Sequence, residues 1–320
     1  MPAATAVGNG QFSAIRPLEA GAPMTYTGPS MNNQLKTVLL LGALSVLLVA
    51  IGGAIGGKAL PVFLILALAM NLGGYLFSDS IVLRMSGARV IDEQEAPALH
   101  AMVRELADRA GLPMPRLAVV ADPTPNAFAT GRNPKRAVVA VTEGLMQLTN
   151  PRELRGVLAH ELAHVANRDT LVATIAAAGA TAITYVAHAI QWGAIFGGAR
   201  QDEEEEGGSA AGGLLLAFLA PIAATLLQMG ISRSREYMAD EYAARLTGDP
   251  EALASALGKL QSYGQSLYQQ GAPTPQPVTQ SLSIVNPLAG AGGLFKLFST
   301  HPPIEDRIAR LLALRGTFAA

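Results

Sequence analysis

Cysteine is absent from the 320-residue sequence. Without thiols the chain has no disulfide bond, no thiolate nucleophile and no cysteine ligand for a metal ion, so histidine and carboxylate side chains remain as the plausible metal ligands. The absence also leaves the redox compartment unreadable from cysteine usage. Histidine is scarce as well, with five residues, which makes a metal-binding histidine motif improbable as an accident.

Charge is also in short supply, because charged residues make up 15% of the chain and the formal net charge is −1. No run rich in lysine and arginine with interleaved aromatic residues occurs, so we expect no binding to nucleic acid. Hydrophobic residues, by contrast, make up 50% of the chain, and the mean hydropathy is positive. This composition is typical of membrane proteins.

Four long apolar stretches account for much of this hydrophobicity. Residues 37–55 and 59–77 each span 19 residues. As helices they would be about 28 Å long, close to the hydrocarbon thickness of a bilayer. They predict a transmembrane hairpin over residues 37–78. A second apolar pair, at about 171–196 and 213–231, predicts another membrane hairpin with an acidic loop between its arms.

The flanks of these stretches predict the orientation of the chain. Basic residues are expected on the cytoplasmic side. Those that border the stretches are Lys36, Arg84, Arg89, Arg233 and Arg235. The acidic loop around Glu204 would then face outward. Residues 1–36 and 269–288 are rich in turn-forming and polar residues without periodicity, so we expect a flexible tail and a flexible loop.

The segment between the two hairpins changes from helical to strand-like patterning. Apolar residues recur at helical spacing from Leu99 to Ala110, and Gly111 and Pro113 end that helix. Short apolar runs follow at 117–120, 127–130 and 137–141. These runs predict a small sheet.

A His-Glu-x-x-His motif follows the predicted sheet, within the helix-compatible run 157–167. With 3.6 residues per turn, His160 and His164 project from the same helix face, so their imidazoles can bind one zinc ion while Glu161 lies beside the open coordination position. The helix is predicted to begin at Asn150 as N-cap, with Pro151 at its first position and Glu153 three residues after the cap. The alternative is an ordinary helix that carries two histidines.

A catalytic zinc ion usually takes three protein ligands, so a third must come from elsewhere in the chain. Glu236 and Asp240 lie one helical turn apart, so one carboxylate could bind zinc while the other hydrogen-bonds a ligand imidazole. The second hairpin would return the chain to the membrane side of His164. The alternative is a pair of solvated carboxylates that bind Arg233, Arg235 or Arg245.

Together these residues predict metal-assisted hydrolysis. Zinc would polarise the scissile carbonyl and activate water, and Glu161 would accept the water's proton and pass it to the leaving amine.

Several segments resemble the HtpX membrane zinc endopeptidases, which are similar to the CaaX prenyl endopeptidases of the same superfamily. The segments that carry the resemblance are residues 71–87 (NLGGYLFSDSIVLRMSG), 126–146 (NAFATGRNPKRAVVAVTEGLM), 158–169 (LAHELAHVANRD), 231–240 (ISRSREYMAD) and 301–303 (HPP). The resemblance covers almost everything after the tail, and these segments are far more specific than the zinc motif alone.

The resemblance implies a role for each candidate residue. His160, His164 and Glu236 would bind one zinc ion per chain, Glu161 would be the general base, and Asp240 would support a ligand from behind. An edge strand would pair with an extended substrate, and it comprises Asn126, Ala127, Phe128, Ala129 and Thr130. On sequence alone, Asn126 could equally be a turn residue.

His301 would approach the active site, as an oxyanion donor or as a gate at the open zinc position. The alternative for His301 is a packing role at the entry of the terminal helix, which also contains Arg307, Leu311 and Leu312.

We therefore expect an α-rich membrane protein with four transmembrane or membrane-associated helices and a cytoplasmic zincin-like (gluzincin) α+β catalytic domain containing a small sheet. The catalytic domain would be assembled from residues 79–169 and 233–320, on either side of the second hairpin at 170–232. By resemblance, it would hydrolyse misfolded or damaged membrane proteins, or other unfolded polypeptides, in quality control at the bacterial cytoplasmic membrane. The alternative is a non-enzymatic membrane scaffold with a structural zinc, which would not need a base such as Glu161.

Overall fold

The computed structural model describes residues 60–172, 233–270 and 302–317, together with a few positions between 39 and 49. The predicted tail, most of the first arm of the first predicted hairpin, nearly all of the second hairpin with its acidic loop, and His301 lie outside the described residues. So does the predicted loop at 269–288, apart from its first two residues.

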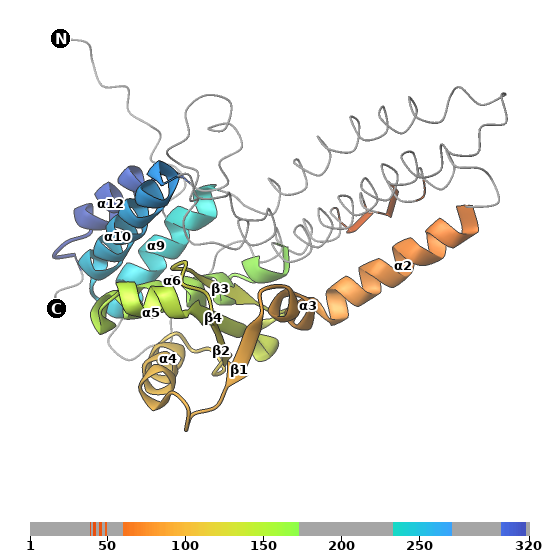
Figure 1. Ribbon diagram of the computed structural model, residues 1–320, viewed down its shortest axis with the longest axis horizontal. Helices are drawn as coiled ribbons and strands as arrows, with labels where there is room; N and C mark the ends of the chain where they lie inside the picture. Colours follow the sequence, from red (N-terminus) through yellow and green to blue (C-terminus); the bar gives the residue numbers. More distant parts are fainter. Residues whose placement is uncertain are drawn as a thin grey trace, which may run out of the picture.

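A four-stranded mixed sheet forms the centre of the described structure (Figure 1). Its strands are β1 (Ala88–Ile91), β2 (Arg116–Val120), β3 (Ala127–Thr130) and β4 (Val138–Thr142). In space they follow the order β1-β2-β4-β3, with β2 and β4 parallel and the two outer pairs antiparallel. Strand β3 therefore lies at one edge of the sheet, and β4 is its neighbour.

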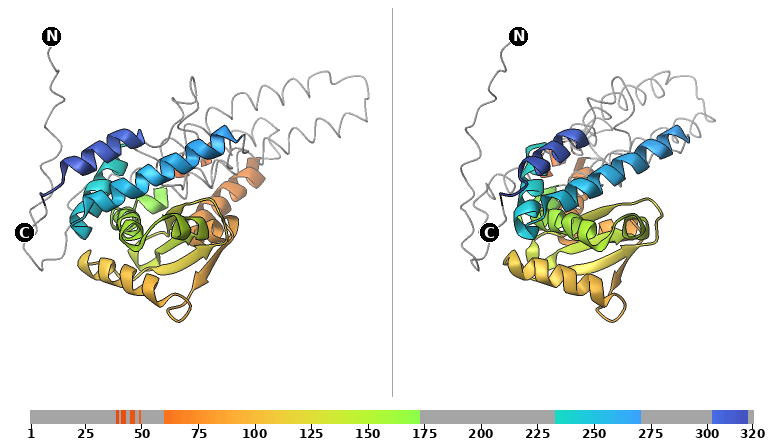
Figure 2. Two further views of the ribbon diagram at one scale, coloured as in Figure 1. Left: turned by 60° about the vertical axis from the view of Figure 1, so that its left-hand side comes forward. Right: turned by 90° about the vertical axis from the view of Figure 1, so that its left-hand side faces the viewer.

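Helices precede and follow the strands. They are α2 (Leu60–Leu76), α3 (Ser78–Met85), α4 (Pro97–Arg109), the short 3-10 helix η1 (Pro134–Arg136), α5 (Glu143–Leu148), α6 (Pro151–Ala166), α9 (Arg233–Thr247), α10 (Pro250–Gln269) and α12 (Ile304–Ala313). Figure 2 shows α9, α10 and α12 gathered on the side of α6 away from the sheet.

Both faces of the sheet are covered, which explains why β4 is apolar along its whole length. Val139 and Val141 belong to the main core with residues of α4, α6, α9 and α10. Val138 and Ala140 point to the opposite face and pack in a smaller cluster with Val82 of α3. Successive side chains of a strand alternate between faces, so a strand buried on both sides reads as a continuous apolar run.

Helix α6 begins as predicted, with a complete capping box. The Asn150 side chain accepts a hydrogen bond from the Glu153 backbone N–H, and the Glu153 carboxylate accepts one from the Asn150 N–H, both at 2.9 Å. Farther along, Gly156 allows α10 to approach, because a Cβ there would lie 3.0 Å from the backbone nitrogen of Leu253. The start and the packing of the motif helix are thus both defined by its first two turns.

Several elements of the structure had no counterpart in the sequence analysis, among them β1 and α3. Strand β1 has only four residues, too few to show an alternating pattern, and it is recognisable from its pairing with β2. Helix α3 begins at Ser78, two residues after α2 ends, so the expected hairpin boundary at residue 78 lies at the start of a further helix.

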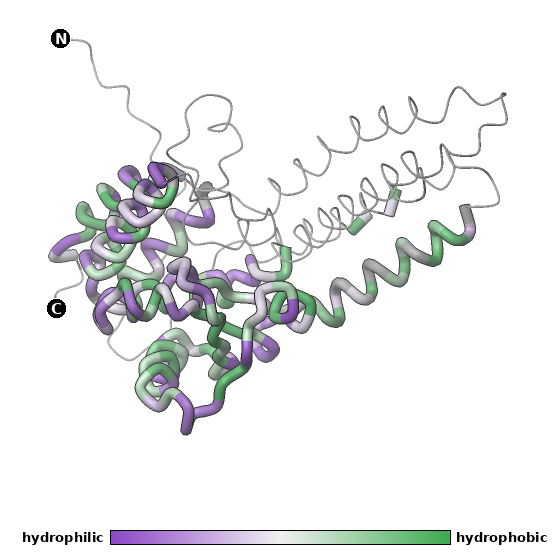
Figure 3. Tube along the Cα trace, viewed as in Figure 1, coloured by the Kyte–Doolittle hydropathy of each residue, from purple (hydrophilic) through white to green (hydrophobic). Residues whose placement is uncertain are grey.

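Helix α2 is apolar over its 17 residues, and Figure 3 shows hydrophobic positions along its length. Its large side chains Val62, Ile65, Leu68 and Leu72 are exposed. Within the described ranges, we find no helix that is both long enough and apolar enough to cross a membrane.

Candidate active site

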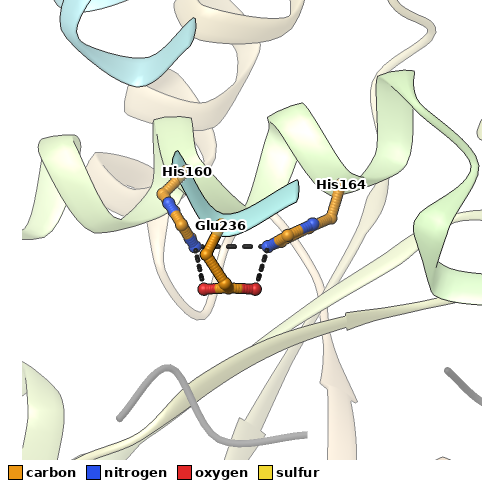
Figure 4. A group of neighbouring side chains, drawn as sticks. All are labelled: His160, His164 and Glu236. Carbon is orange, nitrogen blue, oxygen red and sulfur yellow. Dashed lines mark hydrogen bonds and ion pairs between the residues drawn. The ribbon is translucent and has the colours of Figure 1, made fainter. Parts of the chain in front are cut away.

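The two motif histidines project from the same face of α6 toward Glu236 in the first turn of α9 (Figure 4). Helix α9 packs along α6, which brings these residues together although about 70 residues separate them in the chain. Both His160 and Glu236 are buried, and His164 is partly exposed.

The metal-binding atoms of His160, His164 and Glu236, which we call the ligand triangle, lie within 4.8 Å of one another. His160 Nε2 lies 3.2 Å from His164 Nε2, while Glu236 Oε2 lies 3.6 Å from His160 Nε2 and Glu236 Oε1 lies 3.5 Å from His164 Nε2. Atoms that bind a tetrahedral zinc ion at about 2.0–2.2 Å are about 3.3–3.6 Å apart. Two imidazoles and a carboxylate are also a donor set that zinc accepts, so the residues fit a metal ion.

A carboxylate and an arginine stand behind His160. The His160 Nδ1 atom lies 3.0 Å from Asp240 Oδ1. Arg307 from α12 donates two hydrogen bonds of 2.7 Å to the Asp240 carboxylate and lies 3.4 Å from Glu236 Oε2. The C-terminal helix therefore contributes directly to the surroundings of the metal ligands.

A similar pair stands behind His164. The His164 Nδ1 atom lies 3.1 Å from Asp169 Oδ2, and Arg235 donates a 3.2 Å hydrogen bond to Asp169 Oδ1. Asp169 and Arg235 are both buried.

Burial and neighbouring charges shift the pKa values of several site residues. Burial opposes protonation of His160, but the carboxylates of Asp240 and Glu236 outweigh it and raise the pKa of His160 to about 9. Burial alone would raise the pKa of Asp240, but Arg307 lowers it through its charge and hydrogen bonds. The site thus favours the ionised carboxylate of Asp240, which can accept a hydrogen bond from the Nδ1–H group of His160.

Glu161 is buried next to the ligand triangle, and it is not part of that triangle. Burial raises the pKa of its carboxyl above the ordinary value, while the neighbouring histidines oppose the shift. A raised pKa makes the carboxylate a stronger base, which is what general-base catalysis requires.

The predicted substrate strand lies next to this helix. Helix α6 packs against β3, whose four residues Ala127, Phe128, Ala129 and Thr130 are buried. Asn126 directly precedes the strand, and its backbone exchanges hydrogen bonds with Thr142 at the end of β4. Asn126 therefore extends the β3–β4 pairing. Its role in substrate binding stays a prediction.

The structure brings together His160, Glu161, His164, Glu236 and Asp240. The alternative of two solvated carboxylates is wrong, because Glu236 and Asp240 are only 4% and 3% exposed. Two of the three arginines proposed for that alternative have carboxylate partners elsewhere, since Arg235 pairs with Asp169 and Arg245 with Glu241. The role of His301 stays a prediction.

Sequence reasoning missed three residues of the site. Arg307 was expected only as part of a terminal helix, and Asp169 only as a segment boundary. Arg235 was expected as a flanking cation or, in the alternative, as a partner of solvated carboxylates, and not as a partner of Asp169. Proximity to the motif was the one available signal for Asp169, five residues after His164. The arginines carried no such signal, because pairing of distant charges depends on tertiary contacts.

Two histidines and a glutamate of one helix, beside a small mixed sheet, meet a second glutamate from another helix. This arrangement is typical of a metalloprotease site. Comparison with known proteins agrees. The model of peptidase family M48 matches residues 93–315. A protease HtpX homolog of Pelotomaculum thermopropionicum is 54% identical, covering 88% of this chain and 99% of the relative, and one of Syntrophobacter fumaroxidans is 51% identical, covering 89% and 100%. Among solved structures, the match to S. mikatae Ste24p has a TM-score of 0.46 at 18% identity, and it covers 88% of this chain and 66% of the Ste24p chain.

The chain belongs to peptidase family M48, and it is a metalloendopeptidase related to the proteases named HtpX homologs. The resemblance inferred from the sequence segments is confirmed. The alternative of a non-enzymatic scaffold is wrong.

Proposed function

We propose that this chain is a membrane-bound zinc endopeptidase that cleaves misfolded or damaged membrane proteins in quality control. The observation that carries the zinc assignment is the ligand triangle of His160, His164 and Glu236, in which the two Nε2 atoms lie 3.2 Å apart and each lies within 3.6 Å of a Glu236 carboxylate oxygen, a donor set that suits tetrahedral zinc. Peptidase activity follows from the family, and the donor set supports the choice of zinc as the metal.

The chemistry would be divided between the metal and the protein. When bound, zinc supplies Lewis acidity that polarises a peptide carbonyl and lowers the pKa of water. Glu161 accepts the proton of the attacking water on its carboxylate and then donates it to the leaving amine. Asp240 and Arg307 hold the His160 imidazole in place from behind.

Substrate would bind as an added strand along β3. Supporting this, β3 lies at a sheet edge and packs against the motif helix, so an extended peptide along it would pass close to the ligand triangle. Backbone pairing at a sheet edge requires little side-chain specificity, which suits a protease that handles many unfolded polypeptides.

A membrane location is supported by α2 and by the sequence around it. Adjacent exposed apolar side chains such as Leu64, Ile65 and Leu68 are costly in water and compatible with lipid. The apolar stretches at residues 37–55, 171–196 and 213–231 would complete two hairpins. We assign the protein to the bacterial cytoplasmic membrane, with the catalytic domain facing the cytoplasm.

The test is Glu161→Gln in detergent-purified protein. We expect the zinc content to stay near one per chain, while cleavage of casein and of a model membrane substrate falls by at least about 100-fold, the contribution typical of a general base. The matched control is Glu143→Gln on α5, an exposed glutamate, which should keep both zinc and cleavage.

Chelator treatment of the wild-type protein should abolish cleavage, and zinc should restore it. Cleavage by Glu161→Gln at the wild-type rate would remove this residue from the mechanism. Absence of zinc from the active wild-type enzyme would refute the metal assignment.

A further inference from the structure

Asp169 contacts the ring nitrogen of His164 that points away from the ligand triangle. His164 Nε2 lies 3.5 Å from Glu236 Oε1, whereas its Nδ1 lies 3.1 Å from Asp169 Oδ2. The imidazole is therefore held at both nitrogens. If Nδ1–H donates to Asp169, the lone pair of Nε2 points to the triangle, which is the tautomer a metal ligand needs.

The backbone after α6 is shaped to place Asp169 there. The helix ends at Ala166, and Arg168 adopts a left-handed conformation with φ of 57°, which is uncommon for a residue other than glycine. On the other side of Asp169, the Thr170 hydroxyl donates a 2.9 Å hydrogen bond to the carbonyl of Gly131, the residue after β3. The chain thus turns at Arg168 and is then anchored, through Thr170, to the residue that follows the edge strand.

Arg235 holds the second oxygen of Asp169. Its Nη1 lies 3.2 Å from Asp169 Oδ1, and both residues are buried. A buried carboxylate is costly unless it is paired and hydrogen-bonded, so the guanidinium offsets the cost of burying Asp169 and restricts its rotation. Arg235 directly precedes Glu236, so the first turn of α9 supplies one ligand and one support for another.

The same design occurs on the other ligand. Asp240 lies behind His160 and is held by Arg307, just as Asp169 lies behind His164 and is held by Arg235. In the first arrangement the carboxylate lies on α9 and the arginine on α12, whereas in the second the carboxylate follows α6 and the arginine lies on α9. Their shared feature is a carboxylate placed between an imidazole Nδ1 and a buried guanidinium.

We propose that Asp169 is a positioning residue that fixes the ring orientation and tautomer of His164, and that Arg235 acts through Asp169. The proposal rests on the zinc site assigned above. On this proposal, the segment just after the motif helix and its hydrogen bond to Gly131 help the protein to retain the metal ion.

The test measures zinc affinity by competition with a chromogenic chelator in the full-length, detergent-purified chain. Asp169→Asn keeps the side-chain shape and removes the charge, and we expect it to weaken zinc binding about 10–100-fold. Arg235→Lys should weaken zinc binding in the wild-type background but by less than about twofold in the Asp169→Asn background. Non-additivity of this kind is expected when one residue acts through another.

The matched control is Arg245→Lys, an arginine of the same helix that pairs with Glu241. The zinc affinity of Arg245→Lys should stay within about twofold of wild type. As a second measurement, Asp169→Asn should change the visible spectrum of the cobalt-substituted protein. A purely structural ion pair would lower thermal stability and leave that spectrum unaltered.

Zinc affinity of Asp169→Asn within twofold of wild type would overturn the proposal, and so would an undiminished effect of Arg235→Lys in the Asp169→Asn background. If circular dichroism showed that Asp169→Asn is unfolded, the test would rest on Arg235→Lys alone. Unchanged zinc affinity and an unchanged cobalt spectrum in that variant would then refute the proposal. Failure of the wild-type protein to bind zinc would refute the proposed function itself and this inference with it.

Discussion

Arg307 shows how much a single side chain contributes to this site. It is 0% exposed, lies one helical turn before the buried Leu311 on α12, and binds both Asp240 and Glu236. Burial disfavours its charge, but the carboxylates around it, Asp240 first, raise the pKa of Arg307 further, so it stays protonated. A charge at that depth is tolerated because its partners are in place, and the partners depend on it equally.

Arg307→Met should therefore be strongly destabilising. Removing one partner of a buried pair leaves Asp240 uncompensated, at a cost of about 3–5 kcal/mol. The expected result is a fall of the thermal unfolding midpoint on the order of 10 °C for the chelator-treated protein. The control is Arg315→Met, because Arg315 is exposed and pairs with Glu251 at the surface, where an ion pair contributes about 0–1 kcal/mol.

The double variant Arg307→Met with Asp240→Asn should regain part of the lost stability, since it removes the unpaired charge. Equal midpoints for Arg307→Met and Arg315→Met would contradict this account of the buried pair.

Helix α6 shows how local and tertiary interactions combine within one element. Its capping box lies within residues 150–153, and the same Glu153 carboxylate also accepts hydrogen bonds of 2.7 Å from Ser255 and from Lys259 of α10. The cap that starts the motif helix is thus also a contact to the helix packed against it. This arrangement holds the beginning of α6 on α10, two and a half turns before His160.

The stability of the protein should depend on pH through Glu153. Burial alone would raise the pKa of this carboxyl, but hydrogen bonds from Lys259, Ser255 and Asn150 outweigh burial and lower it below 4.5. Because the folded-state pKa is depressed, the stabilisation is fully present above about pH 4.5 and is lost as the pH falls through the folded-state value.

Thermal unfolding of wild type and Glu153→Gln between pH 7 and pH 3.5 measures this contribution. Wild type should be the more stable at pH 7, and the difference should shrink below pH 4.5. A difference that stayed constant over this range would exclude ionisation of Glu153 as its origin.

At the scale of the whole molecule, the catalytic body is built from separated parts of the chain. Helices α6, α9 and α12 each supply groups to one site, while α2 extends away from this body (Figures 1 and 2). Among the described residues, most exposed large hydrophobic side chains lie at or before Phe77, and few lie in the catalytic body. This distribution is the basis for the membrane location proposed above.

The cysteine-free sequence makes the topology directly testable. Single-cysteine variants Ser209→Cys, in the predicted outer loop, and Gln94→Cys, an exposed residue before α4, can be labelled in intact cells with a membrane-impermeant maleimide. We expect labelling at residue 209 in intact or outer-membrane-permeabilised cells, and at residue 94 only after lysis. Protection of both residues until lysis would contradict the proposed orientation.

Local physics accounts for what the sequence by itself determined. The helix period places His160 and His164 on one face, and the same period pairs Glu236 with Asp240. Hydrogen bonds within four residues define the start of α6, and apolar runs identify β2, β3 and β4. Each of these features depends on neighbours in the chain, so each could be read before the fold was known.

Only the tertiary structure decided which distant groups meet. The packing of α9 along α6 made Glu236 a neighbour of both histidines, and the docking of α12 placed Arg307 against Asp240. Charge pairing is not directional along the sequence, so an arginine 67 residues from its partner has no local pattern to reveal it. Asp169 and Arg235 became recognisable as a pair for the same reason, once the two helices were side by side.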